Sequence, residues 1–132
     1  LVRGVGFPPN GQRTLVCGAD SAGFKVWEAE TGKPLFTLWA TAPYVRSASF
    51  SSDGKRLLTD TGEDNNGREV RVWDVETGNV LLTIPGTRLN AVQSVSFAPD
   101  GRSIVATTFG WGVQLWDGVT GRELSRIPAA DR

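Results

Sequence analysis

The amino-acid sequence predicts an all-β fold made of three copies of one small antiparallel sheet. One phrase, an apolar alternation with a Trp followed by a Thr-Gly pair and a second apolar run, occurs at residues 24–38, 70–84 and 113–127. Clusters of Gly, Asp, Asn and Pro, which favour tight turns, separate the short apolar runs. No stretch shows the 3.6-residue apolar period of an amphipathic helix. We therefore expect twelve strands and no helix.

The repeat has a nearly constant length and covers the whole chain. Phe7, Phe50 and Phe97 each precede a turn, and they lie 43 and 47 residues apart. The Trp residues of the shared phrase lie 46 and 43 residues apart. The other residues that recur in all units, or in the last two, are Gly11, Gly54 and Gly101, Trp27, Trp73 and Trp116, and Asp74 and Asp117. A chain of 132 residues with this period is expected to be one domain, with units at about 1–42, 43–88 and 89–132.

Each unit is expected to form four strands. In the third unit these are "VQSVSF" at 92–97, "SIVATT" at 103–108, "VQLW" at 113–116 and "ELSRI" at 123–127. A Pro-Asp-Gly turn joins the first two strands, and a Thr-Gly turn joins the last two. Pro34 falls in the fourth strand of the first unit. Because proline has no N–H to donate, that strand is expected at a sheet edge, with the first strand innermost.

The first strand of each unit alternates large and small side chains. In the third unit, Val95 and Phe97 alternate with Ser94 and Ser96, and the first two units keep the same alternation. One face of the strand is bulky and the other nearly bare, so the bulky face of one sheet fits the small face of the next where sheets converge. The sequence therefore predicts that the sheets pack radially around an axis.

The units resemble the WD40 repeats of β-propeller proteins over essentially the whole chain. The resemblance depends on the Phe-x-Pro-Asp-Gly segment at 97–101, the Trp-Asp pairs at 73–74 and 116–117, and the Thr-Gly turn that follows each pair. It implies a β-propeller with three four-stranded blades. It also implies that one rim, formed by the connectors between blades and one loop of each blade, is the usual partner-binding face.

The chain departs from the family pattern at residues that usually join the Trp in a hydrogen-bond network. It contains no histidine, so the Gly-His dipeptide of the family is absent. Ser21, Gly67 and Gly110 stand where the family has an Asp six residues before the Trp, and Glu28 replaces the Asp after the first Trp. We therefore expect that the Trp-Ser/Thr-His-Asp network of the family does not form in its usual shape.

Charge and composition exclude several classes of partner and site. Lys and Arg number 14, as do Asp and Glu, so no net field favours nucleic acid or a membrane surface, and we expect neither partner. No apolar run approaches the roughly 20 residues of a membrane span. The single cysteine, Cys17, excludes an internal disulfide and a Cys-rich zinc site and is expected to be a buried thiol. The sequence predicts no cofactor, no metal and a cytoplasmic location.

No catalytic constellation is present in the sequence. Without histidine the commonest general base is missing, and Cys17 lacks the partner that would activate it. Glu63 and Asp64 could form an acid pair, but they precede the tight-turn signal Asn66-Gly67 and are expected at a solvated hairpin tip. The Gly-Trp-Gly segment at 110–112 lacks the strand-to-helix context of a phosphate loop. We expect no enzyme activity.

The candidate partner-binding residues are aromatic, basic and amide side chains that the resemblance assigns to the rim or to the mouth of the central channel. Aromatic residues and Arg are the types that interface hot spots favour. The candidates are Trp39, Tyr44, Arg46, Arg88, Asn90, Gln93, Trp111 and Arg3. The alternative for Trp39 and Trp111 is that they cap the ends of blades.

Three blades form an arc, because propellers usually close with 4–8 blades. An arc leaves an apolar face bare at each end, and such faces mark association surfaces. We therefore expect an excised or processed segment of a longer WD40 propeller, which acts as a non-catalytic protein–protein interaction scaffold. One alternative is a structural half-propeller that pairs with a second copy into a six-bladed ring. Another is part of a propeller whose small-molecule or enzymatic site is completed by missing blades.

Overall fold

The computed structural model describes residues 15–20, 23–39, 45–61, 69–85, 92–108 and 112–128. These residues form eleven strands in three antiparallel sheets, and none of them is helical. The expected twelfth strand, with Phe7 and Gly11, lies outside the described residues. The part of the chain that the structure describes holds no helix that could cross a membrane.

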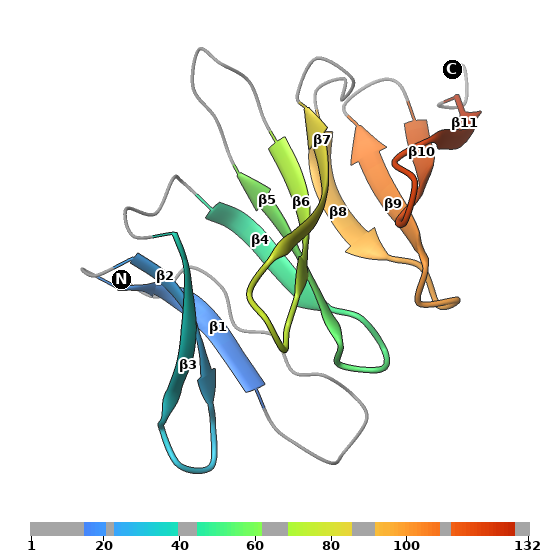
Figure 1. Ribbon diagram of the computed structural model, residues 1–132. Helices are drawn as coiled ribbons and strands as arrows, with labels where there is room; N and C mark the ends of the chain where they lie inside the picture. The colour runs from blue at the N-terminus through green and yellow to red at the C-terminus, as the bar shows by residue number, and fades with distance from the viewer. Residues whose placement is uncertain are drawn as a thin grey trace.

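The three sheets follow one another along the chain and keep the strand order of the sequence. Blade 1 contains β1 (Leu15–Asp20), β2 (Gly23–Glu28) and β3 (Pro34–Trp39). Blade 2 contains β4 (Val45–Phe50), β5 (Arg56–Thr61), β6 (Glu69–Asp74) and β7 (Val80–Pro85). Blade 3 contains β8 (Val92–Phe97), β9 (Ser103–Thr108), β10 (Gly112–Asp117) and β11 (Glu123–Ile127). The sheets stand side by side, as Figure 1 shows from blue to red, in the arrangement of a partial β-propeller.

Tight turns lie at one edge of every sheet, which we call the turn edge. Strands β2, β6 and β10 each end in a turn closed by matching backbone bonds, from Glu28 N to Lys33 O (2.9 Å), Asp74 N to Asn79 O (2.8 Å) and Asp117 N to Arg122 O (2.8 Å). At the opposite edge, which we call the connector edge and which is uppermost in Figure 1, β3, β5, β7 and β9 end and the next strands begin. Antiparallel pairing thus separates the compact turns from the connectors.

Two apolar clusters hold the blades together. The first joins blade 1 to blade 2 and includes Phe24 and Val26 with Leu57 and Trp73, all at most 3% exposed. The second joins blade 2 to blade 3 and includes Leu58, Val70 and Val72 with Ile104 and Trp116, all at most 1% exposed. Adjacent residues of one strand therefore belong to opposite clusters, as Leu57 and Leu58 do on β5, because side chains alternate across a strand.

The predicted radial packing is confirmed by the direction of the first strands. Phe50 and Ala48 pack into the cluster shared with blade 1, and Val95 and Phe97 pack into the cluster shared with blade 2. Each bulky face therefore points toward the preceding blade. Pro34 begins β3, the last strand in the order of its sheet, in agreement with an edge position.

Candidate functional site

The structure places the backbone of three predicted rim residues at the connector edge. Trp39 is the last residue of β3, Arg46 the second residue of β4 and Gln93 the second residue of β8. Their side chains are outside the described part of the chain. The remaining candidates, Tyr44, Arg88, Asn90, Trp111 and Arg3, also lie outside the described residues, as do Glu63 and Asp64.

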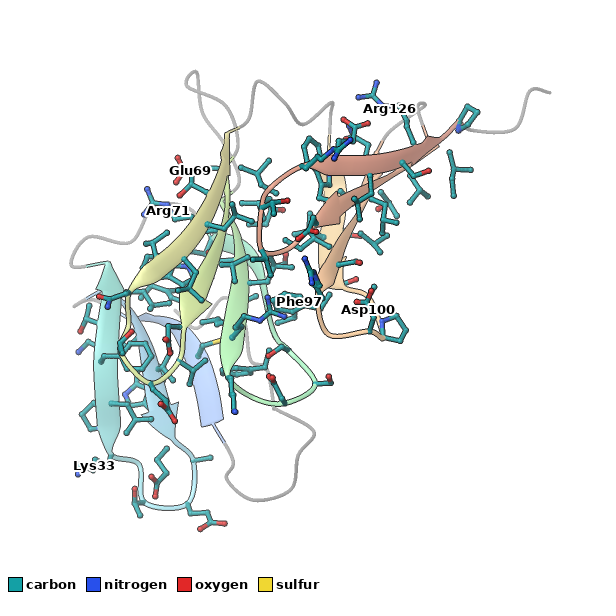
Figure 2. The ribbon with its side chains drawn as sticks, turned by 45° about the vertical axis from the view of Figure 1, so that its right-hand side comes forward. Lys33, Glu69, Arg71, Phe97, Asp100 and Arg126 are labelled. Carbon is teal, nitrogen blue, oxygen red and sulfur yellow. The ribbon has the colours of Figure 1, made fainter. Side chains whose placement is uncertain are left out.

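Close to this edge, β6 carries a column of three side chains, Glu69, Arg71 and Trp73, of which the sequence singled out only Trp73. The Arg71 guanidinium lies over the Trp73 ring, 5.7 Å from its centroid, and its Nε forms an ion pair with a Glu69 carboxylate oxygen. Figure 2 shows Glu69 and Arg71 next to each other on β6. The sequence could have predicted this grouping, because residues 69, 71 and 73 are positions i, i+2 and i+4 of one strand, and such positions share a face. The Trp73 ring and the Glu69 carboxylate together fix the position of the Arg71 guanidinium, and Glu69 partly offsets its positive charge.

A buried hydrogen bond remains from the network that the family usually forms. The Trp73 indole Nε1 donates to Thr59 Oγ1 over 2.9 Å, and both side chains are buried. In blade 2, Thr59 pairs with Arg71. The corresponding residue is Gly18 in blade 1, which pairs with Lys25, and Ala106 in blade 3, which pairs with Gln114. Neither Gly18 nor Ala106 has a hydroxyl, so this bond belongs to blade 2.

The carboxylates at the turn edge are used by their own turns. Asp100 accepts bonds from the backbone N–H of Ser103 and of Arg102 (both 2.8 Å) and from the Ser103 hydroxyl (2.7 Å), which together hold the pKa of Asp100 below its ordinary value. Backbone N–H groups of Val119 and Thr120 lower the pKa of Asp117 in the same way. These carboxylates stabilise turns. No group of three potential metal ligands (His, Cys, Asp or Glu) gathers among the residues that the structure describes.

Asp53 closes the equivalent turn of blade 2. It accepts a 2.6 Å bond from the Ser51 hydroxyl and a 2.9 Å bond from the Lys55 N–H, and these bonds lower the pKa of its carboxyl. A hollow of about 180 Å³ lies beside this turn, lined by Lys55, Arg56, Asp74, Glu76 and Leu81. Its two cations and two carboxylates offset each other, so it offers no net charge to a ligand.

The turn edge also contains the contacts that set the distance between blades. A Cβ atom added at Gly121 would lie 2.9 Å from Leu82 Cδ1 of blade 2, and one added at Gly78 would lie 3.2 Å from Phe36 Cδ2 of blade 1. The Thr-Gly turns of blades 2 and 3 therefore pack closely on the outermost strand of the preceding blade, where glycine leaves the most room. The Arg56 side chain adds to the joint between blades 2 and 3, because it donates to the Gly101 carbonyl and lies 5.2 Å from the Phe97 ring centroid.

The repeated phrases that build these blades match a known family model. The model of the WD domain, G-beta repeat, matches residues 32–74 and 78–117, which is more than half of the chain. The chain belongs to the WD40 repeat family.

Curated WD40 proteins are similar to this chain over most of its length. The WD repeat and SOCS box-containing protein 1 of Xenopus tropicalis is 32% identical over 107 residues, which is 80% of this chain and 24% of that protein. The Periodic tryptophan protein 2 homolog of Schizosaccharomyces pombe is 28% identical over 124 residues, 90% of this chain and 13% of that protein. The chain thus spans about a quarter or less of the length of these relatives.

A solved structure shares the fold. The crystal structure of the computationally designed Ika4 protein superposes with a TM-score of 0.70 at 21% identity, and the match covers 96% of this chain and 72% of that one. At this identity the likeness shows the fold alone.

The WD40 arc ends in two sheet faces whose counterparts inside the arc are buried. Trp73 and Trp116 are 3% and 1% exposed, whereas Trp27, at the same position of blade 1, is only partly buried. On the far side of blade 3, Ile127 is 60% exposed, while Ile84 at the same position of blade 2 is 1% exposed. Trp73 and Trp116 are therefore core residues, and Trp27 differs because no described sheet covers its side of blade 1.

Proposed function

We propose that this chain is a non-catalytic protein–protein interaction scaffold and a segment of a larger WD40 propeller, with its partner at the connector edge. WD40 homologues such as WD repeat and SOCS box-containing protein 1 and the Autophagy-related protein 16 of Arabidopsis thaliana support an interaction scaffold in general terms. WD40 domains generally bind protein partners and generally lack catalysis.

One observation carries the choice of surface. The connectors leave from one edge of all three sheets, whereas the opposite edge consists of turns whose polar groups bond to one another. A surface whose hydrogen-bonding groups are already satisfied offers little to a partner, since affinity concentrates in a few aromatic and Arg side chains. The candidates Trp39, Tyr44, Arg46, Arg88 and Trp111 are of these types. The held cation of Arg71 lies on β6 near the same edge.

The test compares the two edges in the full chain, once a binding protein has been identified by cross-linking and mass spectrometry. The connector-edge variant carries Trp39→Ala and Arg88→Ala. The matched turn-edge variant carries Lys33→Ala and Lys55→Ala, two exposed residues of the β2–β3 and β4–β5 turns. Titration calorimetry should show that the connector-edge pair weakens binding by about 2 kcal/mol or more, while the turn-edge pair changes it little.

Thermal melts of both variants provide the folding control, and each should match the wild-type melt. Equal losses of affinity from both pairs, or a loss from the turn-edge pair alone, would place the partner elsewhere.

A further inference from the structure

The two joints between blades differ in how their buried polar groups are satisfied. In the joint between blades 1 and 2, which we call the first joint, the Trp73 indole N–H donates to the Thr59 hydroxyl over 2.9 Å. None of the described residues that face this joint has a buried side-chain nitrogen or oxygen atom that lacks a hydrogen-bond partner. The first joint therefore buries its polar groups with their hydrogen bonds intact.

The joint between blades 2 and 3, which we call the second joint, buries polar groups that have no partner. Gln114 of β10 is 2% exposed, and it shares its strand face with Trp116, which packs on blade 2. Within the described residues, neither polar atom of the Gln114 amide has a hydrogen-bond partner. Ser47 and Ser49 of β4 point toward blade 3, since Phe50 points toward blade 1, and their hydroxyl oxygens are also buried without a partner. An amide and two hydroxyls have therefore lost their bonds to water here without gaining others.

Such groups weaken the contact that buries them, because water supplies their hydrogen bonds as soon as the contact opens. One unsatisfied group shifts this equilibrium toward the open state by about 10-fold. The apolar clusters do not offset the difference, since the first joint buries Phe24 and Phe50, whereas Phe97 of the second joint is only partly buried. The Arg56 contacts hold the second joint together at the turn edge, but they form no bond to the unsatisfied groups.

We infer that blade 3 separates from blade 2 more often than blade 1 does, so that the second joint is the place where the arc opens. In the open state each sheet keeps its strand pairing, and water bonds to Gln114, Ser47 and Ser49. Gln114 and Ser47 lie in the half of the joint nearer the connector edge, so an opening there changes the spacing of the connectors. This opening needs no partner, so it can be tested whether or not the proposed partner surface is correct.

The first experiment compares the opening of the two joints in one full chain. The native thiol of Cys17 reports on the first joint, because Cys17 is 1% exposed within that cluster. Ala106→Cys places a second thiol in the second joint, where Ala106 is 0% exposed. Iodoacetamide labelling followed by peptide mass spectrometry gives both rates, each divided by the rate in the urea-unfolded chain. We expect the introduced thiol to react about 10-fold faster than Cys17, since a buried thiol reacts only when its surroundings open.

The second experiment assigns this difference to the polar groups. Gln114→Met removes the amide at similar size, so it should slow labelling of the introduced thiol by about 10-fold and change that of Cys17 less than about 3-fold. Thr59→Val is the matched control in the first joint, because it removes the acceptor of the Trp73 N–H while keeping the shape of the side chain. It should speed labelling of Cys17 by about 10-fold and leave the introduced thiol nearly unchanged.

A third measurement needs no introduced thiol and therefore holds even if Ala106→Cys does not fold. Gln114→Met alone should raise the urea midpoint of the chain, and Thr59→Val alone should lower it. Circular dichroism of each variant provides the folding control.

Three results would overturn the inference. The first is labelling of Cys17 as fast as, or faster than, labelling of the introduced thiol. The second is a Gln114→Met chain whose introduced thiol reacts at the same rate or faster. The third is a lower urea midpoint for Gln114→Met, which would mean that the amide stabilises the joint.

Discussion

Blade 2 has a neighbouring sheet on both faces, whereas blades 1 and 3 each have one among the described residues. The same motif consequently has different surroundings in each blade. Trp73 is 3% exposed, contacts a guanidinium and donates a hydrogen bond to Thr59, while Trp27 at the same place of the motif is partly exposed. The repeat therefore specifies a strand and its turn. How much each residue stabilises the fold depends on the neighbouring blade, because each unit buries its faces only against its neighbours.

The largest effect is expected from the Trp pair itself. Trp73→Ala should lower the free energy of unfolding by about 3–5 kcal/mol, since it empties a buried site and leaves Thr59 without its donor. Trp27→Ala should cost only about 1–2 kcal/mol, because part of that ring is already in water. Urea unfolding at one fixed protein concentration measures both.

Similar losses for both Trp variants would break the comparison, because they would mean that the outer face of blade 1 is covered in solution. Repeating the measurement at several concentrations separates the two cases, since association raises apparent stability in proportion to the logarithm of concentration.

The glycines of the Thr-Gly turns should show a smaller difference of the same kind. Gly121→Ala places a Cβ 2.9 Å from Leu82 and strains a residue with φ of 75°, so we expect a loss of about 2–3 kcal/mol. Gly32 has a similar φ of 70° but open space, so Gly32→Ala should cost only the backbone term of about 1 kcal/mol. Differential scanning calorimetry of the two variants measures the difference between their losses of stability. If the two losses are equal, the contact between blades 2 and 3 at this turn has no energetic weight.

The smallest effect is expected from the turn carboxylates. Hydrogen bonds lower the folded-state pKa values of Asp100 and Asp117, so the stabilisation is present above the unfolded-state pKa of about 4 and is lost as pH falls through the lower folded-state pKa. The free energy of unfolding should therefore decrease below about pH 4. Asp100→Asn should flatten this decrease, while Glu76→Gln, a change of an exposed acid on the β6–β7 turn, should leave the slope unchanged. A slope unaltered by Asp100→Asn would show that its turn bonds do not depend on charge.

The sequence by itself determined the repeat, the strands and the turns. The spacing of the Phe and Trp positions predicted three units. The alternation of bulky and small residues on β4 and β8 predicted radial packing. Both predictions were possible because each depends on a pattern among residues close together in the sequence or at a fixed period. Pro34 predicted an outer strand for the same reason. The rim candidates such as Trp39 and Arg46 follow from the resemblance and remain a proposal.

Tertiary structure alone decided which neighbour each face meets. Gln114 is polar, and yet it is 2% exposed, because its β10 position faces blade 2; within the described residues its amide has no hydrogen-bond partner. The Arg56 contact with Phe97 and Gly101 joins residues more than forty positions apart. Both follow from the stacking of one blade on the next, and so does the exposure of Ile127, where the stacking stops. A pattern within one repeat cannot encode these differences, since burial depends on what the adjoining sheet presents.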